Sequence, residues 1–523
     1  MSHYFAWLHR VLIAGAFLLF FFSPFSTASA ATCSITTATV VNQAYVTANS
    51  CTAIEINGNV STTWIGTVDL GGGTVTVKSG YTMTMGSSSQ MVLGANDDFV
   101  VESNATTTHL AGDTYGVQIT ARNVTITGKL SADAKGCNGG RAAGVNGSGP
   151  HASTGICTVG ATGAGKTGGG GGGGGSAGTH GGLGSAGHGG GGATSTIIYG
   201  NSLEPILLGS GGGQGYYDAG YGGHGGGRIA LVVSGTLTVN GSVSASGSDG
   251  NRGDYGSNGG GGGSGGSITI VATSLTGSGT VAANGGVGGI GNINNYGGGQ
   301  GGGGRVAVKY SSSSFALGNI TASGGVRSGW INGQNGTTFI LDRTVDDGVG
   351  TLTITSGFDF PLAGDHSRDA IAVSSGAYLR CPYAATTTSI TVHSAAWISL
   401  SSATVECASA VSQFTISSAQ GLSTTSTVMA FSGATSVRID VPTWTNVTTT
   451  ISTTHASGEF VADVDNPLEF RGFSYTGPAT ASTVYATGTF FILNAGSSVS
   501  FVSSTIRSST SSTIAGALTL DSN

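Results

Sequence analysis

Apolar and polar residues alternate along much of the chain, which is the pattern of β-strands with one buried face. Four segments share one form: an alternating strand, a polar turn, and a second strand that ends in Leu, Val or Ile, one further residue and Ala. These segments span residues 118–132, 228–245, 267–283 and 305–322. A β unit that recurs in this way predicts a repetitive architecture.

The spacing of the repeats selects among repetitive folds. Their final apolar residues are Leu130, Val243, Val281 and Ile320, which are separated by 113, 38 and 39 residues. A propeller blade has a similar length, but the Trp-Asp and Gly-His marks of the common type are absent. A coil of a parallel β-helix takes about 20 residues, so we expect two coils per repeat. The longer first spacing indicates an insertion.

We therefore predict an all-β chain, a right-handed parallel β-helix (solenoid) with a polyglycine-rich insertion. No amphipathic helical run is evident after residue 30. The predicted divisions are a signal peptide (1–30), N-terminal β-helix coils (31–135), a Gly-rich insertion (136–226), β-helix repeats with Gly-rich loops (227–340) and a Ser/Thr-rich β region (341–523). The last region either continues the solenoid or forms a separate β structure.

Residues 1–30 have the features of a secretory signal peptide. Arg10 precedes an apolar run of 12 residues, Val11 to Phe22, and Ala28-Ser29-Ala30 supplies small residues for cleavage. The run is short for a membrane-spanning helix, which needs about 20 apolar residues. We expect a secreted or cell-surface protein without a membrane span after removal of the signal.

Six cysteines follow the signal, and an even number in an exported chain suggests disulfides. They form three near pairs along the sequence, but 15 connectivities are possible. A zinc site is disfavoured because the spacing lacks a Cys-x-x-Cys element. The predicted disulfide residues are Cys33, Cys51, Cys137, Cys157, Cys381 and Cys407.

Composition excludes several classes of protein. Charged residues are 8% of the chain and the net charge is −6, so the basic surface of a nucleic-acid binder is missing. Glycine accounts for 97 of 523 residues without the strict period and abundant proline of collagen. The glycines concentrate between the repeats. Disorder is one interpretation of this block, and extended polyproline-II-like segments packed backbone to backbone are the other.

The stretches YGNSLEPILLGSGGG (199–213), GGGRIALVVSGTLTVNGSVSASG (225–247), GGGSGGSITI (261–270) and GGGGRVAV (301–308) carry a resemblance. Over about residues 118–340 the chain resembles Gly-rich extracellular parallel β-helix surface proteins of the large repetitive adhesin type. The polyglycine part also resembles the receptor-binding tips of some phage tail-fibre adhesins. The resemblance implies architecture and an extracellular location rather than a catalytic motif.

Two functions remain open. The first is a structural or adhesive role in which a surface glycan or protein receptor is contacted, because aromatic side chains on loops stack on sugars or reach proteins. The same rings could instead anchor the glycine segments. The candidate ligand-binding residues are Tyr216, Tyr217, Tyr221, Tyr255 and Tyr296.

The second is a polysaccharide-degrading β-helix enzyme, either a calcium-dependent lyase or a paired-carboxylate hydrolase. Its candidate carboxylates are better explained as solvated turn residues. We therefore favour the non-enzymatic function and name no catalytic residue. The candidate carboxylates are Asp97 and Asp98, Asp342 with Asp346 and Asp347, Asp365 and Asp369, and Asp463 and Asp465.

We expect no cofactor, no resident metal and no nucleic-acid partner. His180, His188 and His224 lie in the glycine block without a paired carboxylate or cysteine, so gap filling is favoured over metal binding. The chain ends in LTLDSN without a visible cap. Because solenoid ends need caps, end-on association or a longer parent chain is a further expectation.

Overall fold

The structure is a computed structural model of the chain, and it describes most of residues 31–521. The residues not described are 1–30, 142–145, 151–154, 161–177, 179, 188–197, 216–219, 254–257, 292–295, 344–350, 360–363, 369, 374–376, 382–386, 395, 408–410, 432–433, 448–449, 453–458, 465–467, 472–473, 477–480, 487–489, 493–497, 503, 509–511, 515–516 and 522–523. The predicted signal peptide lies outside the described residues.

The chain is all-β, with 45% of residues in strands and 3% in helices. The predicted alternation produces the strands. In β6 (Thr74–Val77) and β7 (Thr82–Met85), threonines face outward while Val75, Val77, Met83 and Met85 are fully buried. β-Branched residues and a period of two favour such half-buried strands.

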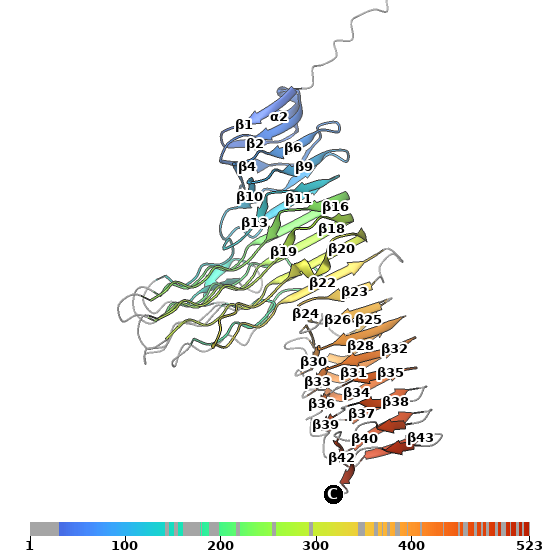
Figure 1. Ribbon diagram of the computed structural model, residues 1–523. Helices are drawn as coiled ribbons and strands as arrows, with labels where there is room; N and C mark the ends of the chain where they lie inside the picture. The colour runs from blue at the N-terminus through green and yellow to red at the C-terminus, as the bar shows by residue number, and fades with distance from the viewer. Residues whose placement is uncertain are drawn as a thin grey trace, which may run out of the picture.

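Most strands stack in parallel in a few long sheets (Figure 1). The largest sheet has 20 strands. They are β1 (Ala31–Ile35), β3 (Cys51–Ile56), β5 (Thr67–Val68), β6, β8 (Met91–Leu93), β9 (Asp98–Val101), β11 (Val117–Ala121), β12 (Val124–Ile126), β16 (Arg228–Val239), β18 (Ser267–Thr276), β20 (Arg305–Ser313), β22 (Thr337–Asp342), β23 (Thr351–Ile354), β26 (Ala370–Val373), β29 (Trp397–Ser401), β32 (Gly421–Thr425), β35 (Trp444–Val447), β38 (Leu468–Arg471), β41 (Phe490–Ile492) and β44 (Ser512–Ile514).

A second sheet of eight strands accompanies the N-terminal part of the first. It contains β2 (Thr39–Val41), β4 (Val60–Trp64), β7, β10 (Thr106–His109), β13 (Lys129–Ser131), β17 (Ser242–Ser244), β19 (Thr280–Ala282) and β21 (Ile320–Thr321), which follows the 3₁₀ turn η1 (Leu317–Asn319).

Two sheets accompany the C-terminal part. The six-stranded one contains β24 (Gly357–Asp359), β27 (Tyr378–Arg380), β30 (Thr404–Glu406), β33 (Val428–Ala430), β36 (Thr450–Ser452) and β39 (Ser474–Thr476). The seven-stranded one contains β25 (Gly364–Arg368), β28 (Thr387–Ser394), β31 (Val411–Ser418), β34 (Ala434–Val441), β37 (Glu459–Val464), β40 (Ala481–Ala486) and β43 (Ser504–Ser508). Two strand pairs are separate: β14 (Ser148–Pro150) with β15 (Cys157–Val159), and β42 (Ser498–Val502) with β45 (Ala517–Asp521).

Strand pairing confirms the repeat alignment predicted from the sequence. Leu130 pairs with Val243, Val243 with Val281, and Val281 with Ile320, each in a parallel register. All four side chains are fully buried. The aligned residues therefore lie one above another in a single column of the core, and the arrangement is compatible with a β-solenoid.

The expectation of two coils per repeat is wrong. Residues that stack directly are 38 apart in this region, as in the pair Leu237 and Leu275, so each repeat supplies one layer of the stack. Nearer the N-terminus, stacked residues lie closer in sequence: Phe99 pairs with Val75, 24 residues earlier, and with Val124, 25 residues later. In the repeats, each layer has more residues than in the N-terminal part, and these additional residues form the glycine-rich segments outside the column.

The glycine-rich segments form layers that project sideways from the middle of the column (Figure 1). Their backbones hydrogen-bond every third residue. The amides of Gly209, Gly212 and Gly215 donate to the carbonyls of Gly226, Gly223 and Gly220 at 2.8 Å. Three residues per turn is the period of a polyproline-II helix, which has no internal hydrogen bonds and so leaves its amides for neighbours.

Two apolar cores meet at β22. Ile340 on one face of this strand belongs to the core of the N-terminal stack, whereas Phe339 and Leu341 on the other face belong to the C-terminal core. β22 continues the parallel stack on β20 but pairs with β23 in an antiparallel register. The C-terminal stack then resumes parallel pairing from β23 to β26.

The structure contains a helix that the sequence pattern did not reveal. α2 (Gln43–Ala48) begins after Asn42, whose side-chain Oδ1 accepts a hydrogen bond from the Tyr45 amide at 2.9 Å. Such an N-cap satisfies one of the free amides of the first turn. Only Val46 is buried, so six residues carry too little apolar periodicity to be recognised.

The three near pairs of cysteines form disulfides: Cys33–Cys51, Cys137–Cys157 and Cys381–Cys407. The first links β1 to the start of its stacking partner β3, and the second links a glycine-rich segment to β15. The described residues contain no free cysteine. Three disulfides are typical of proteins from an oxidising, extracellular compartment.

Candidate functional site

Five apolar side chains on or beside the glycine-rich segments lie outside the buried cores. We call this the end surface and define it as Tyr221, Ile290, Val326, Trp330 and Ile331. Four of these residues are among the exposed large hydrophobic residues, with exposed fractions of 37% for Tyr221, 42% for Ile290, 63% for Val326 and 75% for Ile331. Clustered exposed apolar residues often mark interaction sites, whereas isolated ones need no explanation.

Backbone hydrogen bonds bring these turns together from distant parts of the chain. The amide of Asn251 donates to the Tyr221 carbonyl at 2.8 Å, and the amide of Gly253 donates to the Ile290 carbonyl at 2.9 Å. The segment 251–253 therefore lies beside both Tyr221 and Ile290. The end surface rests on the hydrogen-bonded glycine layers rather than on isolated loops.

Arg327 and Trp330 join the third turn to this arrangement. Arg327 Nη2 donates to the Gly288 carbonyl at 2.7 Å, and the guanidinium carbon lies 5.7 Å from the centroid of the Trp330 ring. The indole packs on the bare backbone at Gly297, where a Cβ would lie 1.7 Å from a ring atom. These contacts fix the position of the half-buried ring beside the exposed Ile331.

The predicted tyrosines have different positions. Tyr221 is exposed and belongs to the end surface, and Tyr296 is half-buried with its carbonyl accepting from the Gly259 amide at 3.0 Å. Tyr216, Tyr217 and Tyr255 lie outside the described residues. Sequence reasoning missed Ile290, Trp330 and Ile331, and their only signal is that large apolar residues are rare between glycine runs.

His180 is buried rather than available to a ligand. Its Nδ1 lies 3.0 Å from the Gly265 carbonyl oxygen, and its ring centroid lies 4.7 Å from that of Tyr199. Burial, and to a lesser extent the charge of Arg305, lowers the pKa of His180 to about 3. His188 lies outside the described residues, and His224 contacts Arg141 in a separate cavity.

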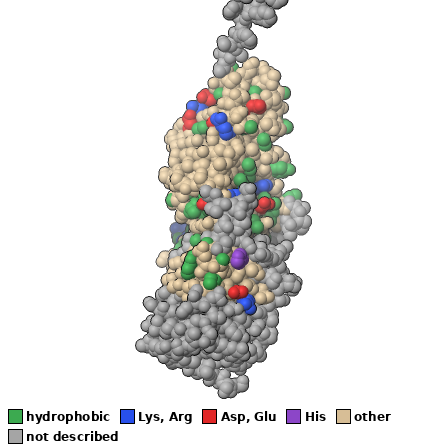
Figure 2. Space-filling view, turned by 90° about the vertical axis from the view of Figure 1, so that its right-hand side faces the viewer, with side chains coloured by type: hydrophobic (Ala, Val, Ile, Leu, Met, Phe, Trp, Pro, Cys, Tyr) green, Lys and Arg blue, Asp and Glu red, His purple; other side chains and the backbone are tan. Residues whose placement is uncertain are grey.

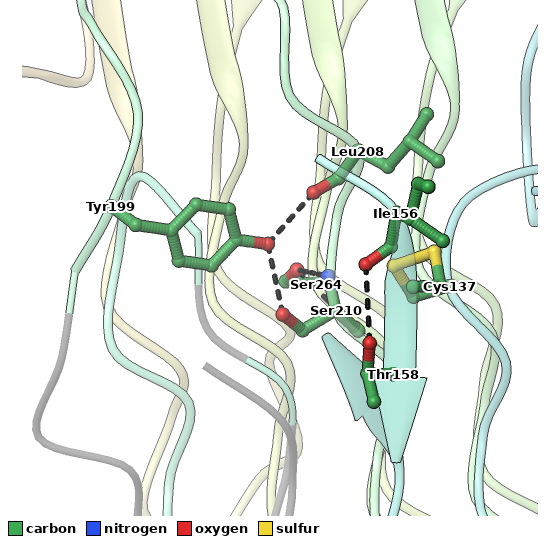
Figure 3. Close-up of a disulfide and its surroundings, with 8 residues drawn as sticks. Cys137, Ile156, Thr158, Tyr199, Leu208, Ser210 and Ser264 are labelled. Carbon is green, nitrogen blue, oxygen red and sulfur yellow. Dashed lines mark hydrogen bonds between the residues drawn. A yellow bond between two sulfur atoms is a disulfide. The ribbon is translucent and has the colours of Figure 1, made fainter. Parts of the chain in front are cut away.

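Tyr199 forms a polar cluster inside the glycine layers near the Cys137–Cys157 disulfide (Figure 3). Its hydroxyl lies 2.8 Å from both the Leu208 carbonyl oxygen and Ser210 Oγ, and Ser264 Oγ accepts from the Ser210 amide at 2.8 Å. Burial raises the pKa of Tyr199 well above its usual value. The ring thus has the anchoring role that the sequence left open for aromatic residues of this block.

The candidate carboxylates that the structure describes have structural partners. Asp97 is fully buried and accepts hydrogen bonds from the amides of Leu70, Gly72, Gly73 and Gly94 at 2.7–3.2 Å. Arg122 pairs with Asp98 through Nε and Nη2 at 2.9 and 2.8 Å.

The remaining candidate carboxylates lie on strands or outside the described residues. Asp342 ends β22, and Asp365 and Asp463 lie within β25 and β37. Asp346, Asp347, Asp369 and Asp465 lie outside the described residues.

Within the described ranges, no group of three His, Cys, Asp or Glu side chains is placed to hold a metal ion. In the same part of the chain, no helix has the length and apolar character needed to cross a bilayer. In the described part of the face that Figure 2 shows, uncharged polar side chains and backbone prevail and charged side chains are few. Contacts on such a face depend on hydrogen bonds and apolar stacking more than on charge.

Comparisons with known proteins found no matching family, no matching curated protein and no matching solved structure.

Proposed function

We propose that the protein is an exported structural and adhesive protein, a right-handed parallel β-helix from which a polyproline-II-like glycine insertion presents its end surface to a surface glycan or a protein receptor. The chain contacts its partner from the cell surface or the extracellular space. This function agrees with the resemblance to Gly-rich surface proteins over residues 118–340.

The end surface is the observation that carries this proposal. Tyr221, Ile290 and Ile331 are exposed large apolar residues separated by tens of residues in sequence. Backbone hydrogen bonds to segment 251–253 connect Tyr221 with Ile290, and the Arg327 side chain connects the segment of Ile331 to Gly288. A soluble fold has no internal reason to collect such residues far from its core, because leaving each one in water forgoes roughly 1.5–3 kcal/mol of burial. A partner that covers them would recover part of this free energy.

Binding is tested by exposing the purified mature chain to soluble and insoluble glycans and to intact cells, with calcium and with a chelator. Retained protein and released sugar ends are scored together. We expect retention without products. The double variant Trp330→Ala with Ile331→Ser should reduce retention at least tenfold, because it removes the stacking ring and its exposed neighbour.

Ile65→Ser is the matched control, since Ile65 is 54% exposed on the N-terminal column. Unchanged retention by the double variant would exclude the end surface as the contact site. Release of products that the chelator abolishes would instead establish the polysaccharide-degrading alternative.

A further inference from the structure

A cavity lies on the glycine layers beside the hairpin of β14 and β15. Its volume is about 450 Å³, and its lining includes Asn138, Arg141, Asn146, Ser148 and His224. The Cys137–Cys157 disulfide fixes both ends of this region, because Asn138 follows one cysteine and β15 begins at the other. None of these residues belongs to the end surface.

The charge in this cavity has an unusual partner. An Nη2 hydrogen of Arg141 is directed at Nε2 of His224. Because a guanidinium can only donate, Nε2 of His224 accepts this hydrogen bond. Burial, followed by the charge of Arg141, lowers the pKa of His224. Among the described residues, no carboxylate forms an ion pair with Arg141. A guanidinium has five N–H donors, and the contact with His224 accounts for one.

Other basic side chains in the described part of the chain form ion pairs with carboxylates. Lys78 lies 2.5 Å from Glu102, and Arg122 lies 2.8 Å from Asp98. Arg327 and Arg380 donate to backbone carbonyls, whereas Arg141 is exposed and donates to a histidine in a cavity. Its fork of donors matches a carboxylate or a sulfate in a bidentate geometry.

The polar groups around the arginine are suited to a sugar. Asn138 is exposed and offers an amide with donors and an acceptor, and Ser148 adds a hydroxyl to the lining. Hydroxyl groups of a sugar ring donate and accept in the same way, whereas a small inorganic anion would need only donors. Val159, which is 61% exposed at the rim, adds an apolar surface for a ring face.

From this arrangement we infer that the cavity binds an acidic saccharide, whose carboxylate or sulfate group pairs with Arg141 while its hydroxyl groups contact Asn138. This is a second binding site, with a defined ligand class, beyond the contact proposed for the end surface. Neutral glycans lack the group that pairs with the guanidinium and bind weakly.

The test measures calorimetric affinities for a uronate trimer, a sialylated trisaccharide and a sulfated trisaccharide, each beside its neutral counterpart. At least one acidic sugar should bind tenfold or more tightly than its neutral counterpart. Arg141→Gln should weaken that binding at least tenfold, and Arg141→Lys should weaken it less, because the charge remains but the bidentate fork is lost. Lys129→Gln is the control for the loss of one positive charge elsewhere.

The end-surface double variant, Trp330→Ala with Ile331→Ser, should retain the affinity for the acidic sugar. This result separates the two proposals, because failure of the end-surface proposal leaves the cavity result intact. Thermal unfolding of Arg141→Gln checks that the variant is folded. The inference is overturned if no acidic sugar binds, if neutral counterparts bind equally well, or if Arg141→Gln binds like the unaltered protein.

Discussion

At the scale of single residues, the glycine layers depend on the absence of side chains at particular positions. Gly263 illustrates the constraint, because an added Cβ would lie 2.0 Å from the carbonyl oxygen of His224 in the neighbouring segment. The amide of Gly263 also donates to the Ser248 carbonyl at 3.0 Å. A methyl group would therefore separate two backbones that are held together by hydrogen bonds.

Gly263→Ala should destabilise the glycine layers by about 3 kcal/mol, because overpacking a rigid contact displaces the backbone. Gly318→Ala is the matched control: a Cβ at this position would meet no atom within 4 Å, and its effect should stay within about 1 kcal/mol. Hydrogen exchange of the layer amides measures both. Equal protection in the two variants would contradict close packing of the layers.

Buried histidines make stability depend on pH. Burial lowers the pKa of His109 to about 4 and that of His180 to about 3, from an ordinary value of 6.5. Both rings are therefore neutral in the folded protein. The unfolded chain takes up protons first as the pH falls below 6.5, so stability is complete above that pH and decreases below it.

Between pH 6 and pH 4.5, each of these histidines should reduce the free energy of unfolding by about 1.4 kcal/mol per pH unit. His180→Gln should remove its share of this slope, whatever its effect on stability at pH 7. Denaturant unfolding at a series of pH values gives the slope. A variant slope equal to that of the unaltered chain would show that His180 does not remain neutral in the fold.

At the scale of elements, the sequence pattern predicted the strands, which depend on local alternation of apolar and polar residues. It missed features that depend on contacts between distant residues. Leu130, Val243, Val281 and Ile320 were aligned correctly because each ends a strand of the same form. The predicted number of layers per repeat was wrong because the glycine segments have no alternating pattern. The sequence therefore does not show where the chain leaves the column.

The candidate sites were the least predictable feature. The end surface combines Tyr221, Ile290 and Ile331 from three separate segments, which are connected by backbone hydrogen bonds and by the Arg327 side chain. Arg141 and His224 are 83 residues apart and meet across two glycine segments. No periodicity connects such positions, so neither site could be assembled from spacing alone.

β22 connects the two apolar cores, and its neighbouring side chains allow the cores to be tested separately. Phe339→Ala should destabilise the C-terminal core by about 3–5 kcal/mol, and Ile340→Ala the N-terminal core by about 2–5 kcal/mol. Hydrogen exchange should become faster in β29 and β32 for the first variant and in β16 and β18 for the second. Identical exchange maps for the two variants would show one cooperative core instead.

At the scale of the whole molecule, the glycine layers are attached to the C-terminal stack as well as to the column from which they arise. The Tyr378 hydroxyl donates to the Asn335 carbonyl at 2.6 Å, and Arg380 Nη2 donates to the Gly181 carbonyl at 2.9 Å. The guanidinium also lies 4.3 Å from the Tyr378 ring centroid. These two side chains of β27 hold the layers in a fixed direction relative to the stack.

The double variant Tyr378→Phe with Arg380→Ala should loosen this attachment without unfolding either core, since both side chains lie at the contact rather than inside a core. Loss of charge-assisted hydrogen bonds to backbone carbonyls costs about 2 kcal/mol, which corresponds to roughly thirty-fold faster exchange of the amides at 334–336. Arg438→Ala, which removes an exposed pair with Asp440 at 3.4 Å, is the control. Small-angle scattering should show a larger radius of gyration only for the double variant. An unchanged radius together with unchanged exchange would mean that the column alone orients the layers, and the end surface would then keep its direction without the second attachment.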